Sequence, residues 1–363
     1  MFVALRDLRH ARGRFTLMLV VIILITFLVT FLASLTAGLS RESTSAITGL
    51  RADHLAFAMP EPGAEPDFTA SSVTADQWRT WADAAGVVSA DPLGVAMTRA
   101  RSATTTSSVT ALGIEPDSTL LPAGATGLAP GTVLASASAA SDLSVRAGDV
   151  VDIAGREFHV GAVLDTEASF AHTPVVWTTL EDWQAIGARS SSATGDATAT
   201  VVALTLDGSA RIADTDAVAG TATLTTTQAR SAISSFSSEN GSLTLMQAFL
   251  MVISALVVGA FFTVWTISRS ADIAVLKALG ASTGYLLRDA IGQAALVLVL
   301  GVGLGTALAA GAAALLGGAV PVVVATTTTV VPAVVLVLVG LVGAVLAIAR
   351  ITRVDPHAAL AAH

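Results

Sequence analysis

Four residues beside the uncharged stretches of this chain have side chains that could bind a ligand. Glu42 follows the first such stretch, and the second one begins between Glu239 and the pair Met246 and Gln247. A carboxylate close to hydrocarbon is costly unless it reaches water or a partner, whereas a thioether and an amide add soft and polar contacts. This set predicts a substrate-binding site where the first two spans leave the membrane. The alternative is that Glu42 and Glu239 simply lie in solvent beyond the lipid.

The chain lacks the residue patterns of an enzyme. It has no cysteine, and its six histidines share no metal-ligand spacing. No glycine-rich stretch ends in Gly-Lys-Ser/Thr, the pattern of a phosphate-binding loop. We therefore expect a non-catalytic chain with no metal site and no cofactor of its own, which cannot hydrolyse ATP by itself.

A second informative stretch covers residues 269–289, between two uncharged runs. Its large apolar residues recur at helical spacing, and a glycine then supplies a helix stop. A short amphipathic helix at the membrane face would offer its apolar ridge to a cytoplasmic partner, and each large side chain buried there would contribute about 1.5–3 kcal/mol. An ordinary loop helix is the alternative, and the lysine fits either an ion pair or plain solubility. The predicted coupling residues are Ile273, Leu276, Lys277, Leu279 and Gly280.

Uncharged runs long enough to cross about 30 Å of hydrocarbon set the architecture. They predict a membrane α-helical protein of four spans with an inserted extracytoplasmic α+β domain. The first run is too long for a signal peptide, so we expect it to be retained as a span. The predicted boundaries are an interfacial helix at 1–14, spans at 15–40, 242–268, 290–316 and 331–349, the inserted domain at 41–241, a cytoplasmic loop at 269–289, an external loop at 317–330 and a cytoplasmic tail at 350–363.

Small residues recur at a spacing of four within the last two spans. The third span contains Gly301 and Gly305, and the fourth contains Gly340 and Ala344. Such ridges let helix backbones approach closely in lipid. We expect them to be helix–helix contacts.

Charge is segregated along the sequence. Of the net charge of −8, residues 40–240 hold ten Arg against twenty-three Asp and Glu, whereas the rest of the chain holds nine basic and four acidic residues. Basic residues that flank membrane spans mark the cytoplasmic side. This pattern predicts a multi-pass plasma-membrane protein with both termini in the cytoplasm and the acidic domain outside. The chain also lacks the basic patch of a nucleic-acid-binding protein.

The inserted domain has mixed helix and strand signals. Residues 74–85 begin with a capping-type threonine and place Trp78 and Trp81 on one helical face, where we expect core anchors. Alternating strands around 131–177 predict a β-rich insertion. Residues 226–238 resume helical spacing and are predicted to lead into the second span.

Three motifs give the chain a resemblance to a known family. The stretch Asp272-Ile273-Ala274-Val275-Leu276-Lys277-Ala278-Leu279-Gly280-Ala281-Ser282 resembles the cytoplasmic signature of permeases related to FtsX and MacB, the type VII ABC transporters. The tail from Arg350 to Leu360 resembles the usual C-terminal ending of that family. The opening from Leu5 to Phe15 is similar to the entry helix of its short four-span branch, which includes the haem-efflux (HrtB-like) and DevC-like permeases.

The resemblance implies a partner and a class of activity. A separate cytoplasmic ATPase, in two copies, would bind ATP and Mg²⁺ and dock on residues 269–289 of a permease homodimer. The permease would expel a hydrophobic compound from the membrane lipid, with haem as the first candidate substrate and Glu42, Glu239 and Met246 as its candidate contacts. Two alternatives remain: export of a lipid, glycolipid or antibiotic, and FtsX-like signalling to a cell-wall hydrolase.

Overall fold

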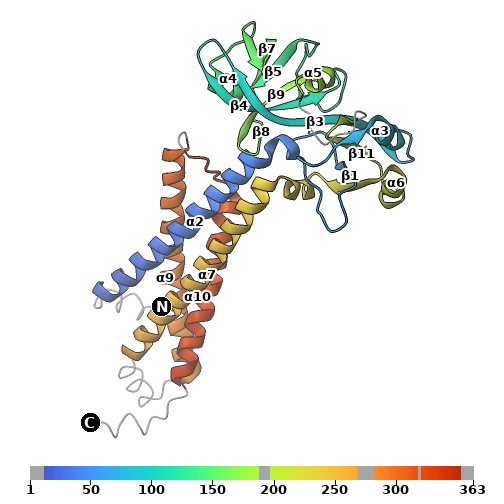
Figure 1. The fold of residues 1–363 in the computed structure, drawn as a ribbon. Coiled ribbons are helices and arrows are strands. Elements are labelled where there is room, and N and C mark those ends of the chain that lie inside the picture. Colours follow the sequence, from blue (N-terminus) through green and yellow to red (C-terminus); the bar gives the residue numbers. More distant parts are fainter. Residues whose placement is uncertain (1–11, 188–196, 269–281, 318–319, 353–363) are drawn as a thin grey trace. The chain divides into compact units, whose positions relative to one another are not determined.

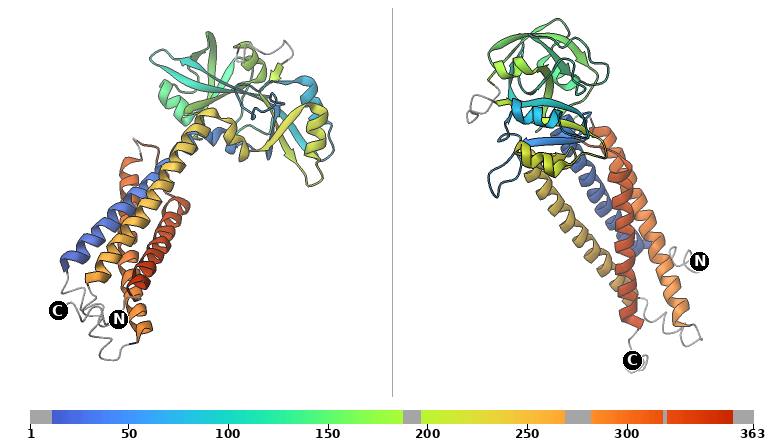
Figure 2. Two further views of the ribbon diagram at one scale, coloured as in Figure 1. Left: turned by 60° about the horizontal axis from the view of Figure 1, so that its bottom comes forward. Right: turned by 90° about the vertical axis from the view of Figure 1, so that its right-hand side faces the viewer.

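A computed structural model describes residues 12–187, 197–268, 282–317 and 320–352 (Figures 1 and 2). Residue contacts divide the chain into two compact units. One unit comprises residues 1–38 and 241–363, and the other comprises residues 39–240. The first is a bundle of helices and the second is an α+β domain.

Four helices of the described chain are long and apolar enough to cross a membrane, which confirms the predicted fold class. They are α2 (Arg12–Thr48), α7 (Ser234–Ser268), α9 (Thr283–Leu316) and α10 (Thr326–Thr352). Figures 1 and 2 both show them running side by side. Their candidate spans are Thr16–Thr48, Ser234–Trp265, Arg288–Leu316 and Thr326–Leu346.

The small-residue ridges are helix contacts, as the sequence predicts. A Cβ atom added to Gly301 would lie 2.6 Å from a side-chain carbon of Ile22, and one added to Gly305 would lie 2.6 Å from Thr26. On α10, a Cβ at Gly340 would lie 2.7 Å from Leu298. The close approach of α9 to α2 and of α10 to α9 therefore requires glycine, which has no side chain, at these positions.

The fourth helix begins earlier than predicted. It starts at Thr326, whereas the sequence pattern suggested a loop that continues to residue 330. The hydroxyl of Thr328 accepts a hydrogen bond from the Ala325 N–H at 3.0 Å, so a threonine that looks like a breaker instead satisfies a free donor at the helix start. The preceding segment is fixed to α2, because the Val323 N–H donates to the carbonyl oxygen of Ser34 at 3.0 Å.

The second unit contains the short elements of the chain. In order they are β1 (His54–Ala58), β2 (Val73–Thr74), α3 (Ala75–Ala82), β3 (Val87–Arg101), β4 (Thr106–Ile114), β5 (Thr132–Ser136), α4 (Ala137–Leu143), β6 (Val150–Ile153), β7 (Arg156–Leu164), β8 (Ser169–Phe170), β9 (Thr173–Thr179), α5 (Leu180–Ala185), β10 (Ala197–Ala199), β11 (Val201–Leu206), α6 (Ile212–Ala219), β12 (Thr221–Thr225) and the 3₁₀ turn η1 (Gln228–Ala232).

One large sheet joins most of these strands in the order β12-β1-β11-β3-β4-β9-β5-β7-β6, with β8 paired to β9. Strand β3 connects its two parts, because residues 87–93 pair with β11 and residues 94–101 pair with β4. The segment 131–177, predicted as a β-rich insertion, supplies strands β5 to β9. These strands join β4 through the parallel β4–β9 pairing and return to β3 through the antiparallel β3–β6 pairing.

Alternate residues of the strands face two different cores. On β4, Val109 and Ala111 belong to one core, whereas Leu112 and Ile114 belong to the other. The first core is covered by α3, α4, α5 and α6. The second is covered by the end of α2, by η1 and by the start of α7. Helices therefore contribute to both cores, and the second core is built in part from the ends of the long helices.

Two local predictions for this domain have different outcomes. The helix at 74–85 is present as α3, with Thr74 and Gln77 forming a reciprocal capping box and Trp81 fully buried. The continuous helix from residue 226 is wrong. The chain forms η1, then Ile233 takes an extended conformation, and α7 begins at Ser234.

Candidate functional site

The site is built on a tight hairpin between β8 and β9. Phe170 pairs with Thr173, so Ala171 and His172 form a two-residue loop. Both have positive φ values, 49° and 62°, the combination that type I′ hairpins require. Asn and Gly usually occupy such positions, because other side chains are strained there. The geometry of this two-residue loop sets the position of His172.

Hydrogen bonds tie this hairpin to the end of α2. The Ala171 N–H donates to the carbonyl oxygen of Ser43 at 2.9 Å. Two residues closer to the end of α2, the Ser45 hydroxyl accepts from the Ser169 N–H at 2.9 Å. Because two backbone donors of the hairpin are satisfied by α2, the hairpin and the helix end form one structural element.

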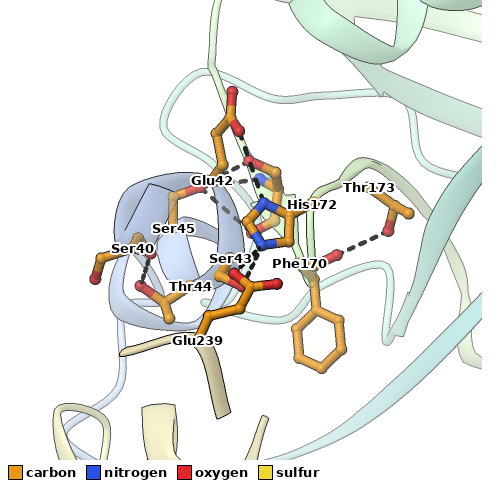
Figure 3. Close-up of polar contacts among 10 residues, drawn as sticks. Ser40, Glu42, Ser43, Thr44, Ser45, Phe170, His172, Thr173 and Glu239 are labelled. Carbon is orange, nitrogen blue, oxygen red and sulfur yellow. Dashed lines mark hydrogen bonds and ion pairs between the residues drawn. The ribbon is translucent and has the colours of Figure 1, made fainter. Parts of the chain in front are cut away.

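His172 brings together two carboxylates from different helices (Figure 3). Its Nε2 lies 2.8 Å from a carboxylate oxygen of Glu239 on α7, which is a hydrogen-bond distance. Its Nδ1 lies 3.7 Å from a carboxylate oxygen of Glu42 on α2. The Ser43 hydroxyl is a further neighbour, 3.3 Å from Nε2. We refer to Glu42, Ser43, His172 and Glu239 as the His172 cluster.

The cluster is partly open to water. The side chain of His172 is 28% exposed, and those of Glu42 and Glu239 are 48% and 46% exposed. When Nε2 carries the imidazole proton, it donates to the Glu239 carboxylate, and the Ser43 hydroxyl is a more distant neighbour of the same nitrogen. Within the described part of the chain, no group of His, Asp and Glu side chains could hold a metal ion. Polar contacts of His172 thus connect α2, the hairpin and α7.

The structure gives the four predicted substrate residues different surroundings. Glu42 and Glu239 come together at His172, a residue for which the sequence predicts no role. Met246 and Gln247 belong to the helical unit, where Met246 is 56% exposed and the Gln247 side-chain amide donates to the Thr36 hydroxyl at 2.7 Å. Gln247 therefore joins α7 to α2, and the binding role predicted for all four stays a prediction.

His172 was missed for a physical reason. Its loop has neither Asn nor Gly, so the usual signal of a two-residue hairpin is absent. Its partners are 130 positions before it and 67 positions after it, beyond any periodic pattern. The predicted coupling residues Ile273, Leu276, Lys277, Leu279 and Gly280 all lie outside the described residues.

Two family models match the chain. Residues 15–222 match the MacB-like periplasmic core domain, and residues 244–356 match the FtsX-like permease C-terminal domain. The first model covers more than half of the chain and ends within the α+β domain. The second covers most of α7 together with α9 and α10.

Several relatives resemble the chain over different lengths. A protein of Staphylococcus epidermidis named as a hemin transport system permease, HrtB, is 30% identical over 39% of this chain and 41% of its own length. A protein of Staphylococcus haemolyticus with the same name is 34% identical over 35% of this chain and 36% of its own length. An uncharacterized ABC transporter permease of Mycobacterium bovis is 25% identical over 98% of both chains. The chain thus spans about two fifths of the length of the hemin permeases that it matches.

Solved structures are similar at a lower level. The extracellular domain of the ABC-type transporter YknZ from Gram-positive bacteria aligns with 48% of this chain and 99% of its own, at a TM-score of 0.35 and 16% identity. The periplasmic region of MacB from Actinobacillus actinomycetemcomitans aligns with 52% of this chain and 95% of its own, at a TM-score of 0.36 and 12% identity. The two family models together carry the assignment. The chain belongs to the FtsX/MacB family of ABC transporter permeases and is a membrane protein with a large extracellular domain.

Proposed function

We propose that this chain is the permease subunit of a type VII ABC transporter that expels a hydrophobic compound, with haem as the first candidate, from the membrane. The observation that carries the proposal is the 30–34% identity to hemin transport permeases over 35–39% of the chain. Haem has an apolar macrocycle and charged propionates, so a permease for it needs apolar surface together with a few polar or soft groups. Glu42, Glu239 and Met246 are side chains of those kinds, and His172 adds an imidazole, a common haem ligand.

The ATPase is a separate subunit. Membership of the ABC permease family implies a partner ATPase, and permeases of this family are generally non-catalytic. We propose a permease homodimer with two ATPase copies docked on residues 269–289. Leu276→Asp should then release or uncouple the ATPase without preventing membrane insertion, because a charge would replace apolar area at the docking ridge. Unchanged co-purification and ATP turnover in this variant would contradict the docking assignment.

Haem binding is tested on the purified full-length protein in lipid nanodiscs. Titration with haemin should shift its Soret band saturably in the wild-type protein. The shift should weaken in Glu239→Gln, His172→Ala and Met246→Leu, which are measured separately. His159→Ala is the matched control, because His159 is an exposed histidine on β7 of the same domain.

The outcomes separate the parts of this proposal. No saturable shift in the wild-type protein would make haem the wrong substrate and favour a lipid, glycolipid or antibiotic. A shift that all three variants retain would move the haem contacts elsewhere. A loss in His159→Ala equal to that in His172→Ala would show a nonspecific effect of histidine removal.

We also propose that both termini are cytoplasmic. The wild-type chain has no cysteine, so single cysteines report their side of the membrane without background. Cysteines at the exposed positions Ala103 and Thr327 should react in intact cells with a membrane-impermeant thiol reagent, and one at exposed Ser282 should not. Labelling of Ser282→Cys from outside would contradict the proposed orientation and show that this loop faces outward.

A further inference from the structure

The α+β domain contains a cavity of about 230 Å³ that is separate from the His172 cluster. It lies where the segment before β2, strand β3, hairpin strand β8 and helix α5 meet, with the end of β10 on one side. Every lining residue is uncharged. The cavity belongs entirely to residues 39–240.

Aromatic rings form the inner wall of the cavity. Phe68, Phe170 and Trp183 are only 4%, 3% and 2% exposed. The rings of Phe68 and Phe170 meet edge to face, with centroids 5.2 Å apart and planes at 85°. Trp183 is held against Gly94 and Gly113, where an added Cβ would lie 2.4 Å from its side chain. These contacts fix the position of the Trp183 indole in the wall.

The mouth of the cavity is polar and accessible. Met97 is 52% exposed, and the Thr69 hydroxyl is engaged with Asp67. The Ser71 hydroxyl also has partners, since it donates to the Thr200 carbonyl oxygen and accepts from the Ala58 N–H. The hydroxyl of Ser72 has no hydrogen-bond partner among the residues that the structure describes. It is therefore the group available to a ligand at the rim.

We propose that this cavity binds a neutral compound of about one ring that carries a hydroxyl group. Its volume exceeds the roughly 150 Å³ that accommodates benzene and is below the roughly 300–1,000 Å³ of pockets for drug-sized ligands. Aromatic walls favour a flat or cyclic apolar body, the Ser72 hydroxyl favours a polar end, and an uncharged lining disfavours an ion. A macrocycle such as haem does not fit, so this site is distinct from the proposed substrate site.

The hairpin gives the cavity a connection to the long helices. Phe170 in the cavity wall and His172 in the cluster leave the same hairpin, on either side of Ala171 (Figure 3). The hairpin is hydrogen-bonded to the end of α2, and His172 is hydrogen-bonded to Glu239 on α7. A ligand that packs against Phe170 would therefore act on the contacts between these two helix ends. The ligand is an effector under this proposal.

The test uses the full-length protein in nanodiscs with ¹³C-methyl-labelled methionine. The chain has six methionines, and Met97 is the one at the cavity mouth. Titration with p-cresol should shift the Met97 methyl signal saturably. Ser72→Phe, which fills the mouth, should abolish the saturable shift. Ser72→Ala should weaken p-cresol binding about three- to tenfold, with little change in toluene binding, because only the hydroxyl contact is lost.

Three outcomes would overturn the proposal. A Met97 shift that rises linearly, or that persists in Ser72→Phe, would indicate partition into lipid or a surface effect. Equal affinity for benzoate would contradict the neutral ligand class. The link to the helices is read from the ring signal of ¹³C-labelled His172, assigned with His172→Gln. If that signal stays fixed while p-cresol saturates the cavity, the effector role is wrong.

Discussion

Glycines allow close contacts in both the helical unit and the α+β domain, but the groups that they contact differ. In the bundle, Gly301 and Gly305 admit side chains and backbone of another long helix. In the domain, Gly94 and Gly113 admit one indole ring, that of Trp183. Lipid is as apolar as a leucine side chain, so helices in a membrane gain from close van der Waals contact. In water, burial of a large aromatic surface supplies the gain.

The two units also differ in where their small hydroxyl side chains lie. Along α2, the side chains of Thr26, Thr30 and Ser34 are at most 2% exposed and lie one turn apart, which makes a narrow hydroxyl stripe inside the bundle. In the domain, hydroxyls cap helix starts, as Thr74, Ser136 and Thr179 do. Small polar residues serve helix initiation in both units, since Ser282 caps α9 and Thr328 bonds at the start of α10, and in the bundle they also serve helix packing.

The largest effect should come from filling a helix contact. Gly305→Leu should leave little folded protein, because its Cβ would lie 2.6 Å from Thr26 and 2.7 Å from the backbone oxygen of Ile23, a worse clash than the roughly 1–3 kcal/mol of ordinary overpacking. Gly303→Leu is the control, since a Cβ at Gly303 meets nothing within 4 Å. Monodisperse yield and thermal stability in detergent give the comparison. Equal behaviour of the two variants would contradict the α2–α9 contact.

The second-largest loss of stability should come from removing the Trp183 indole, which is buried in the α+β domain. Trp183→Ala should cost about 3–5 kcal/mol of unfolding free energy, because a fully buried aromatic ring is removed. Gly94→Ala should destabilise the wild-type domain and have a smaller effect in the Trp183→Ala background, since the ring atoms that it meets are then gone. Hydrogen exchange of the β3 and β4 amides in the full-length protein measures both. Additive effects would show that Gly94 does not accommodate Trp183.

A smaller effect is expected at the start of α3. Thr74→Ala should cost about 1 kcal/mol, because the capping box between Thr74 and Gln77 loses its hydroxyl. Thr80→Ala in the same helix should change stability by less than about 0.5 kcal/mol, since its hydroxyl only donates back to the Asp76 carbonyl oxygen. The same exchange measurement, read on the α3 amides, separates them. A cost for Thr80→Ala as large as that for Thr74→Ala would exclude the cap as the cause.

The smallest effect lies at the exposed edge of the domain. The Ser209 hydroxyl and then its backbone N–H donate to Asp207, and these hydrogen bonds lower the pKa of that carboxyl. Ser209→Ala should raise the Asp207 pKa toward its ordinary value without reaching it, because the backbone bond remains. A lowered pKa stabilises the fold above the unfolded-state pKa, and this contribution is lost as pH falls through the folded-state pKa. Carboxyl ¹³C titration of both proteins measures the difference, and identical curves would contradict the hydroxyl contribution.

Part of this molecule could be predicted from the sequence because the relevant signals are local. Uncharged runs predict the membrane helices, since hydropathy sums over consecutive residues. The Gly301 and Gly340 ridges follow from a spacing of four, and the Thr74 cap follows from its position before an amphipathic stretch. The threonines before residue 330 show the limit of such signals: they predict a loop but begin α10, because their hydroxyls can either break or cap a helix.

The tertiary structure decided what depends on distant partners. Only the fold places His172 between Glu42 and Glu239, and only the pairing of β3 with both β11 and β4 makes one sheet of the domain. The cavity beside Phe170 and Trp183 likewise needs segments more than one hundred positions apart. Sequence periodicity reports which face of an element is apolar, but it does not specify which other element covers that face. That choice depends on shape and hydrogen-bond geometry in three dimensions.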